Sequence, residues 1–276
     1  MELENKLFKL IVRFFIVIGA LVSLFPFYWM IVMASKPNSE IYRTPPSLAI
    51  GGELFKNIQT VMQETSFFHS LMNTIFIAVT STILILFFDS LAGFAFAKLS
   101  FKGKAFLFTF LMGTMMIPGQ LNIIPSFYLM DRLGWVGSYK ALIIPGMANA
   151  FGIFWIKQYC TDAIPDSLLE SAKLDGCTIF RSYFSIALPI MKPALAFLAL
   201  YSFMGAWNDY MWPLIILNDE SKYTLMLALT QLKGIFAVNY PLVITGALLA
   251  TLPLLLIFIM FSKQLIAGIT EGAVKE

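Results

Sequence analysis

The sequence is poor in charged residues. Only 13% of its 276 residues are Asp, Glu, Lys or Arg, whereas a soluble globular domain carries about 25%. Hydrophobic residues make up 59% of the chain, and the mean hydropathy is +0.79. These values exclude an ordinary soluble domain. The net charge of +3, from 19 basic and 16 acidic residues, is too small for a nucleic-acid surface, so no nucleic-acid partner is expected.

Residue types that support catalysis or metal binding are also scarce. The chain has one histidine, His69, and two cysteines, Cys160 and Cys177, which excludes a disulfide framework and most zinc sites. The absence of a Gly-x-Ser-x-Gly motif and of a ligand cluster disfavours an intramembrane enzyme. No phosphate-binding loop occurs, since Gly103-Lys104 lacks the upstream glycine and a following hydroxyl residue. We therefore expect no enzymatic activity, metal or cofactor in this chain.

Long hydrophobic runs are what the sequence does contain. A helix needs about 20 mostly apolar residues to cross about 30 Å of hydrocarbon. The runs predict an all-α polytopic membrane protein with six transmembrane helices: Leu10–Ala34, Leu71–Ala97, Ala105–Met130, Tyr139–Ile156, Pro193–Leu217 and Leu242–Ser262. The third run is the least regular, because Pro118 and Pro125 predict a kink or an end near Met116.

The basic residues predict the orientation. Six spans place both termini on one side of the membrane. The segments on that side carry twelve Lys and Arg residues, and the opposite loops, of almost equal total length, carry seven. By the positive-inside rule, both termini face the cytoplasm of a bacterial-type inner membrane, with the Lys98 to Lys104 turn as the strongest anchor. Cys160 and Cys177 then lie on the reducing side as free thiols.

The most informative segment is the cytoplasmic stretch 162–189. Pro165 at a first helical position begins a short helix, which Asp175-Gly176 ends. A second amphipathic helix follows, with one apolar stripe formed by Ile179, Phe180, Tyr183 and Phe184. Two interpretations fit this pattern: an interfacial helix on lipid headgroups, or a docking element for a cytoplasmic partner.

This segment resembles the Glu-Ala-Ala-x-x-x-Gly loop of binding-protein-dependent ABC import permeases. The shared residues are Glu170-Ser171-Ala172, Asp175-Gly176-Cys177, and Leu188-Pro189 with Pro193. Further motifs in the same order are Asn73-Thr74, Leu91 to Ala97, Ile117-Pro118, Ile124-Pro125, Trp207-Asn208-Asp209, Trp212-Pro213 and Gly268 to Lys275. The chain is most similar to the smaller, six-span permease of the maltose and multiple-sugar type. The resemblance implies one type I ABC importer transmembrane domain over 1–276, with a C-terminal cytoplasmic tail at 268–276.

In that family the loop is the coupling helix, which enters a cleft of the ATPase subunit and transmits its closure. The resemblance assigns this role to Glu170, Ser171, Ala172, Asp175, Gly176 and Cys177. Ser171 and Cys177 stand where the family has alanine, and these small-for-small changes leave docking intact. Glu276 stands where the family often has glycine. The tail is either an ATPase contact or a disordered end.

The resemblance also implies the partners and the solute. The chain forms half of a translocation path for a sugar, with a second permease subunit, two ATP-binding subunits that hold ATP and Mg, an extracytoplasmic sugar-binding protein and the lipid bilayer. Two alternatives remain: a permease of this superfamily for a non-sugar solute, and an ion-coupled secondary transporter.

Several residues are candidates for the solute path or for the binding protein. Asp89 and Asp209 are acids at membrane depth, which usually face a cavity or a partner. Asn208 and Asp209 either line the path or join helices by buried hydrogen bonds. Near the outer side, Phe236, Asn239 and Tyr240 either contact the binding protein or act as interfacial anchors.

Overall fold

The computed structural model describes the chain over residues 2–234 and 238–273, and its side chains over 8–234 and 238–260. The described part consists of helices joined by turns and loops and contains no β-strand. Its contacts form two compact units. Unit one holds residues up to 67 with 228–256, and unit two holds 68–227 with the residues from 257 onward.

Three helices are long and apolar enough to span a membrane. They are Phe8–Ala34 in α1 (Glu2–Ala34), α3 (Phe67–Lys98), and Tyr240–Met260 in α14 (Tyr240–Ala273). Two bent pairs each amount to one further candidate: α4 (Lys104–Met115) with Gly119–Arg132, and Ile179–Ile190 with α11 (Lys192–Asn208). The described chain therefore has three to five candidate spans, and six continuous ones are not found.

The predicted break in the third span is confirmed. Helix α4 ends at Met115, and the chain then turns by 94° into η2 (Gly119–Asn122) and α5 (Ile123–Arg132). Pro118 lies in this turn with an extended ψ of 127°, since proline fixes φ and has no N–H to continue the helix.

The predicted fourth and fifth spans differ from the structure. In place of a helix over 139–156 there are α6 (Lys140–Ile143) and α7 (Ala150–Ala163), separated by a loop that contains Pro145-Gly146. At 1.5 Å per residue, α7 is only about 21 Å long. The fifth span ends early, because α11 stops at Asn208 and α12 (Met211–Ile216) is a separate helix. A hydropathy window sums across such breaks and cannot detect them.

Unit one joins the end of α1 to α2 (Leu54–Glu64) and to the start of α14. Asn57 Nδ2 donates to the Ala34 and Lys36 carbonyls at 2.8 and 3.2 Å. Thr245 Oγ1 donates to the Pro241 carbonyl at 2.7 Å within α14. Side chains of η5 (Leu229–Lys233) pack closely against Gly246. The remaining short element of this unit is η1 (Asn38–Glu40).

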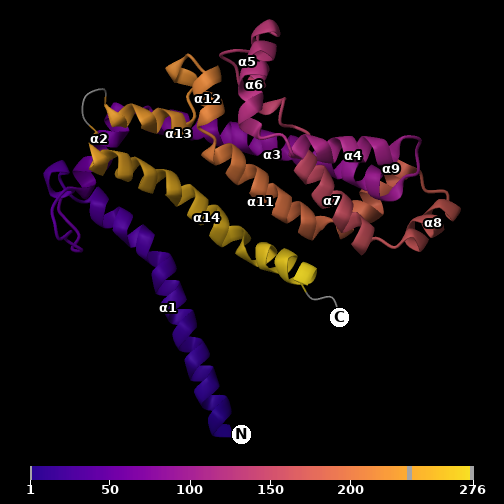
Figure 1. The fold of residues 1–276 in the computed structure, drawn as a ribbon, viewed down its shortest axis with the longest axis horizontal. Coiled ribbons are helices and arrows are strands. Elements are labelled where there is room, and N and C mark those ends of the chain that lie inside the picture. The colour runs from indigo at the N-terminus through magenta and orange to yellow at the C-terminus, as the bar shows by residue number, and fades with distance from the viewer. Residues whose placement is uncertain (1, 235–237, 274–276) are drawn as a thin grey trace. The chain divides into compact units, whose positions relative to one another are not determined.

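Unit two is arranged along α3, as Figure 1 shows. At the N-terminal end of α3, Asn73 Nδ2 donates to the carbonyls of Ser221 and Tyr223, both at 3.0 Å, and Thr74 Oγ1 accepts from the Leu225 N–H at 2.7 Å. Helix α7 packs against both α4 and α11. Trp155 Nε1 of α7 donates to the Ala194 carbonyl of α11 at 3.1 Å.

Two apolar cores stabilise unit two. One joins the second half of α3 to α7, to α11 and to the segment 183–191 that precedes α11. Ile156, Tyr183 and Leu198 are among its buried residues. The other joins α5, α6 and α12 around Met130 and Ile216. The other elements of this unit are α8 (Asp166–Leu174), α9 (Ile179–Ser182), the π-helix η3 (Tyr183–Ala187), α10 (Leu188–Ile190) and η4 (Glu220–Lys222), while α13 (Leu225–Ala228) leads out of it.

Candidate functional site

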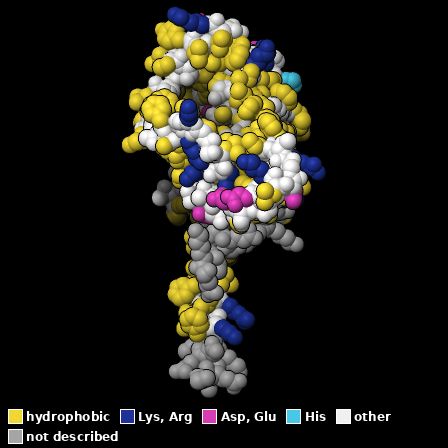
Figure 2. Space-filling model, turned by 90° about the vertical axis from the view of Figure 1, so that its right-hand side faces the viewer, with side chains coloured by type: hydrophobic (Ala, Val, Ile, Leu, Met, Phe, Trp, Pro, Cys, Tyr) yellow, Lys and Arg dark blue, Asp and Glu magenta, His cyan; other side chains and the backbone are white. Residues whose placement is uncertain are grey.

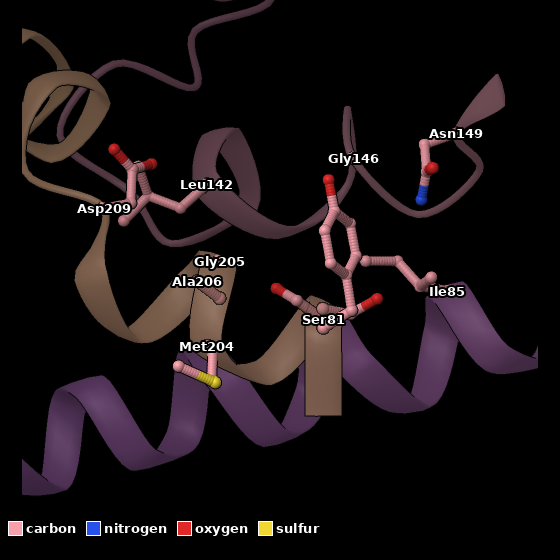
Figure 3. A pocket seen from close by; sticks show the side chains of 11 residues that line it. Ser81, Ile85, Leu142, Gly146, Asn149, Met204, Gly205, Ala206 and Asp209 are labelled. Carbon is pink, nitrogen blue, oxygen red and sulfur yellow. The ribbon is translucent and has the colours of Figure 1, made fainter. Parts of the chain in front are cut away.

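A cavity of about 640 Å³ lies among α3, α11 and the loop before α7, within unit two. Figure 3 shows Asp209 and Asn149 on opposite sides of it, with Ser81 of α3 between them. Its lining is formed by Ser81, Ile85, Leu142, Gly146, Asn149, Tyr201, Ser202, Met204, Gly205, Ala206 and Asp209. The volume falls in the range of small-molecule sites, which is roughly 300–1,000 Å³.

One wall of the cavity is fixed by Asp89, which is fully buried. Its carboxylate accepts from the Asn149 N–H at 3.0 Å and from Asn149 Nδ2 at 2.9 Å. Asn149 Oδ1 in turn accepts from the Gly152 N–H at 2.8 Å, which caps α7. The carboxylate lies against Gly152, where an added Cβ would overlap it. The structure thus gives Asp89 a definite position: it joins α3 to the N-terminus of α7, where a negative charge is favourable.

Asp209 and Asn208 lie at the end of α11 and make local hydrogen bonds. Asn208 Nδ2 donates to the Met204 carbonyl within its own helix at 2.9 Å. Asp209 Oδ1 accepts from the Trp212 N–H at 3.3 Å, and its side chain lines the cavity. Of the three residues Trp207, Asn208 and Asp209, Trp207 is the one buried in the core. Asp209 therefore reaches the cavity, whereas Asn208 is not among the lining residues.

The residues predicted to form the coupling loop lie in and after α8. Pro165 is the N-cap of this helix, whereas the sequence predicts it at the first helical position. The predicted end at Asp175-Gly176 is confirmed: Gly176 has φ +80°, its N–H donates to the Lys173 carbonyl, and the Cys177 N–H donates to the Ala172 carbonyl at 2.9 Å. This pair of bonds is a Schellman motif, in which glycine adopts the left-handed conformation without a Cβ penalty.

Most side chains of α8 are exposed to the surroundings. Ala172 and the preceding Ile164 are buried, while Glu170, Ser171 and Asp175 are exposed. Leu174 is 89% exposed at the end of the helix. Figure 2 looks onto the side of the molecule where α8 lies in Figure 1, and charged side chains of both signs gather on this face.

The predicted apolar stripe after Gly176 is partly wrong. Ile179, Phe180 and Phe184 are exposed, but Tyr183 is only 2% exposed. Its hydroxyl lies 2.6 Å from Ser90 Oγ of α3, and its ring packs on Phe94 with centroids 5.5 Å apart. Tyr183 shares the helical register of Ile179 and Phe180, so its burial comes from the contacts with α3, which the pattern of this segment does not reveal.

An ion pair joins the C-terminal end of α3 to the start of α8. Lys98 Nζ donates to Asp166 Oδ1 at 2.7 Å, with the Lys98 side chain 5% exposed and that of Asp166 78% exposed. The hydrogen bond and the positive charge of Lys98 hold the pKa of the Asp166 carboxyl below its ordinary value. The predicted coupling segment, 162–189, is thus attached to α3 through both Lys98 and Ser90.

The predicted binding-protein contacts lie in unit one or outside the described residues. Asn239 Oδ1 accepts from the Leu242 N–H at 3.5 Å at the start of α14, and the Tyr240 ring packs on Tyr42 with centroids 6.1 Å apart. Phe236 lies outside the described residues, as does the end of the tail at 274–276. Residues 268–273 continue α14. Among the described residues, no three His, Cys, Asp or Glu side chains gather as metal ligands.

Comparison with known proteins decides the family. Residues 89–267 match the family described as binding-protein-dependent transport system inner membrane component. This chain belongs to that family. It is 32% identical over 275 residues to an arabinooligosaccharide transport system permease of Bacillus subtilis, covering 99% of this chain and 98% of that protein. It is 33% identical over 258 residues to a lactose transport system permease of Rhizobium radiobacter, covering 94% and 93%.

Other relatives carry different solutes in their names, and a solved structure shares the fold. An sn-glycerol-3-phosphate transport system permease of Pectobacterium atrosepticum is 29% identical, covering 93% of this chain and 94% of that protein. A bacterial ABC transporter for import of the acidic polysaccharide alginate superposes with a TM-score of 0.78 at 22% identity, over 94% of this chain and 97% of that one. The chain is thus a multi-pass membrane permease component with the all-helical fold of ABC importer permeases.

Sequence reasoning missed several residues around the site. Ser81, Ser202 and Tyr201 line the cavity, but within apolar runs they carry no motif. Asn149 could have been found, because an Asn directly before an apolar run is a typical N-cap. Its pairing with Asp89 joins residues 60 positions apart, which no local pattern reveals.

Proposed function

We propose that this chain is the smaller permease subunit of a sugar importer and forms half of the translocation path. The observation that carries the proposal is α8: a short exposed helix, closed by a Schellman motif and attached to α3, at the position of the Glu-Ala-Ala-type motif. Relatives named for arabinooligosaccharide and lactose transport, each covering more than nine tenths of this chain, support a sugar as the solute.

The mechanism follows from this arrangement. A sugar-loaded binding protein docks outside, and two ATPase subunits, which hold ATP and Mg, close on the cytoplasmic side. Glu170 pairs with a basic residue of the ATPase, and Ala172, Ser171 and Cys177 allow close approach. Closure moves α8, and the motion passes to α3 through Lys98 and to the helices around the cavity. A second permease chain completes the path, so the protein itself is a transport subunit and not an enzyme.

The topology in the proposal is that of the six-span subunit, with both termini cytoplasmic. Basic residues favour this orientation, because Lys98, Lys102 and Lys104 follow α3 at the end that carries α8. Helices α6 and α7 together with the loop between them would supply the crossing that neither helix is long enough to make alone.

Affinity purification of the tagged chain from native membranes tests the proposal. In mild detergent, a second permease and an ATP-binding chain should co-purify, and Glu170→Arg should lose the ATP-binding chain while the protein still inserts. Isolation without any ATPase across several detergents would contradict the importer function and favour an ion-coupled secondary transporter.

A further inference from the structure

The cavity of unit two contains two buried hydroxyl groups with no partner in the described structure. Ser81 of α3 and Ser202 of α11 are 6% and 7% exposed, and neither Oγ atom makes a hydrogen bond. Both side chains line the cavity. A buried polar group is unfavourable unless something pairs with it, so these two hydroxyls indicate a ligand that offers hydrogen bonds from within the cavity.

Asp209 adds acceptor atoms on another side of the same cavity (Figure 3). The backbone N–H groups of Trp212 and Met211 occupy two acceptor positions of the Asp209 carboxylate, whereas a carboxylate offers about four. Asn149 on the opposite side has both amide atoms engaged, by Asp89 and by Gly152. The wall is therefore fixed, and Asp209 retains acceptor capacity for hydroxyl groups of a solute.

The charge of the lining separates classes of solute. The described residues that line the cavity include one acid, Asp209, and no Lys, Arg or His. Phosphate and carboxylate groups are bound in proteins by paired cations, and a single acid in the wall repels them. Tyr201 adds an aromatic ring, 53% exposed and 4.7 Å from the ring of Phe151 between centroids, and such a ring suits the C–H face of a sugar.

We infer that this cavity is a subsite for a neutral sugar, in which Asp209, Ser81 and Ser202 bind hydroxyl groups and which excludes anionic solutes. The inference rests on the proposed function and names its solute class. The side chains that line the cavity thus distinguish this chain from a permease for a phosphorylated or acidic solute.

The test uses the complete importer in proteoliposomes, with the second permease, the ATPase and saturating binding protein. Arabinotriose and lactose are the neutral probes, and trigalacturonate and sn-glycerol 3-phosphate are the anionic ones. The variants are Ser202→Ala and Asp209→Asn. Ser70→Ala is the matched control, because Ser70 of α3 also has a buried Oγ without a partner in the described structure but does not line the cavity.

The wild type should import a neutral probe in preference to both anionic probes. Asp209→Asn should lower the uptake of that probe about tenfold, the effect of losing one charge-assisted hydrogen bond, and Ser202→Ala should lower it less. Uptake should fall more than ATP hydrolysis, so that fewer sugar molecules are imported per ATP. A variant that merely failed to fold would lose both activities together.

Three results would overturn the inference. Equal uptake by Ser202→Ala, Asp209→Asn and Ser70→Ala would exclude a binding role for the cavity. Preferential uptake of an anionic probe would reject the neutral-sugar assignment while leaving the importer function intact. Import of none of the four probes, despite an assembled complex, would reject the sugar-import function and this inference with it.

Discussion

The cavity wall and the coupling segment use acidic residues in opposite ways. In the wall, Asp89 is completely buried and both of its oxygens are engaged by Asn149. In the segment, Glu170 is exposed on α8, and Asp166 has its partner on one side and solvent on the other. The contrast shows that the acid of the wall is paired within the chain, whereas the acids of α8 are exposed, as the proposed docking of the ATPase requires.

One helix connects these two regions. Ser81 at the cavity and Lys98 at the coupling segment are both in α3, 17 residues apart, which corresponds to about 26 Å of helix. Between them, Asp89 contacts the loop before α7 and Ser90 contacts the Tyr183 hydroxyl. These contacts give the proposed coupling a route from α8 to the cavity along a single helix.

The largest effect on folding is expected at the closest contact in the wall. Gly152→Ala places a methyl group on the Asp89 carboxylate, and we expect a loss of about 3 kcal/mol or more, or no folded protein. Thermal unfolding in detergent measures it. Gly113→Ala in α4, where nothing lies within 4 Å of the new Cβ, is the control.

A double variant sharpens this prediction. If Asp89 is the obstacle, Gly152→Ala with Asp89→Ala should unfold at about the temperature of Asp89→Ala alone, since residues in contact show non-additive effects. Additive losses would indicate that the methyl group is excluded by something other than Asp89.

The largest effect on transport without a folding defect is expected at Glu170. Glu170→Arg should reduce uptake to a background level and leave the unfolding temperature unchanged, because the side chain is exposed. Glu64→Arg, the same charge reversal at an exposed helical glutamate of α2, should transport normally. Normal uptake by Glu170→Arg would remove the coupling role from α8.

A smaller loss is expected when Asp89 is replaced alone. Asp89→Ala leaves the two donors of Asn149 without their acceptor, and we expect about 1 kcal/mol for each, the lower end of the range for an unpaired buried group. Asp89→Asn retains one acceptor and should lose about half as much. Asp131→Ala, at an exposed acid of α5, should change little. Equal stability of all three variants would contradict the structural role of Asp89.

The smallest effect is expected at the Lys98 and Asp166 pair, and it depends on pH. Because Lys98 lowers the pKa of the Asp166 carboxyl, the pair stabilises the fold fully above the ordinary aspartate pKa of about 3.9. This contribution is lost as the pH falls through the lowered pKa. Asp166→Asn should therefore unfold slightly earlier than the wild type at neutral pH. A stability difference that persists well below about pH 3 would contradict this account.

Local patterns in the sequence predicted the features that local chemistry determines. Composition identified a helical membrane protein, Pro118 marked the end of α4, and Gly176 marked the end of α8, as the structure confirms. Each of these follows from a residue whose own backbone preferences fix the turn.

Features that depend on contacts between distant residues could not be predicted. The segment 139–156 is apolar enough to be taken as one span, but Pro145-Gly146 interrupts it and Asn149 starts a new helix bound to Asp89. Tyr183 is buried because its hydroxyl meets Ser90 of α3, 93 positions away in the sequence. The cavity depends on Ser81 and Ser202, 121 positions apart, meeting across α3 and α11.

The most direct test of the account measures sugar uptake and ATP hydrolysis together in proteoliposomes that carry Glu170→Arg or Asp209→Asn. If the two regions have separate roles, Glu170→Arg should lose both activities, because the ATPase no longer acts on the permease. Asp209→Asn should lose uptake while ATP hydrolysis stimulated by the loaded binding protein continues. The same loss of both activities in both variants, or a loss of uptake alone in Glu170→Arg, would contradict the division between a coupling segment and a solute cavity.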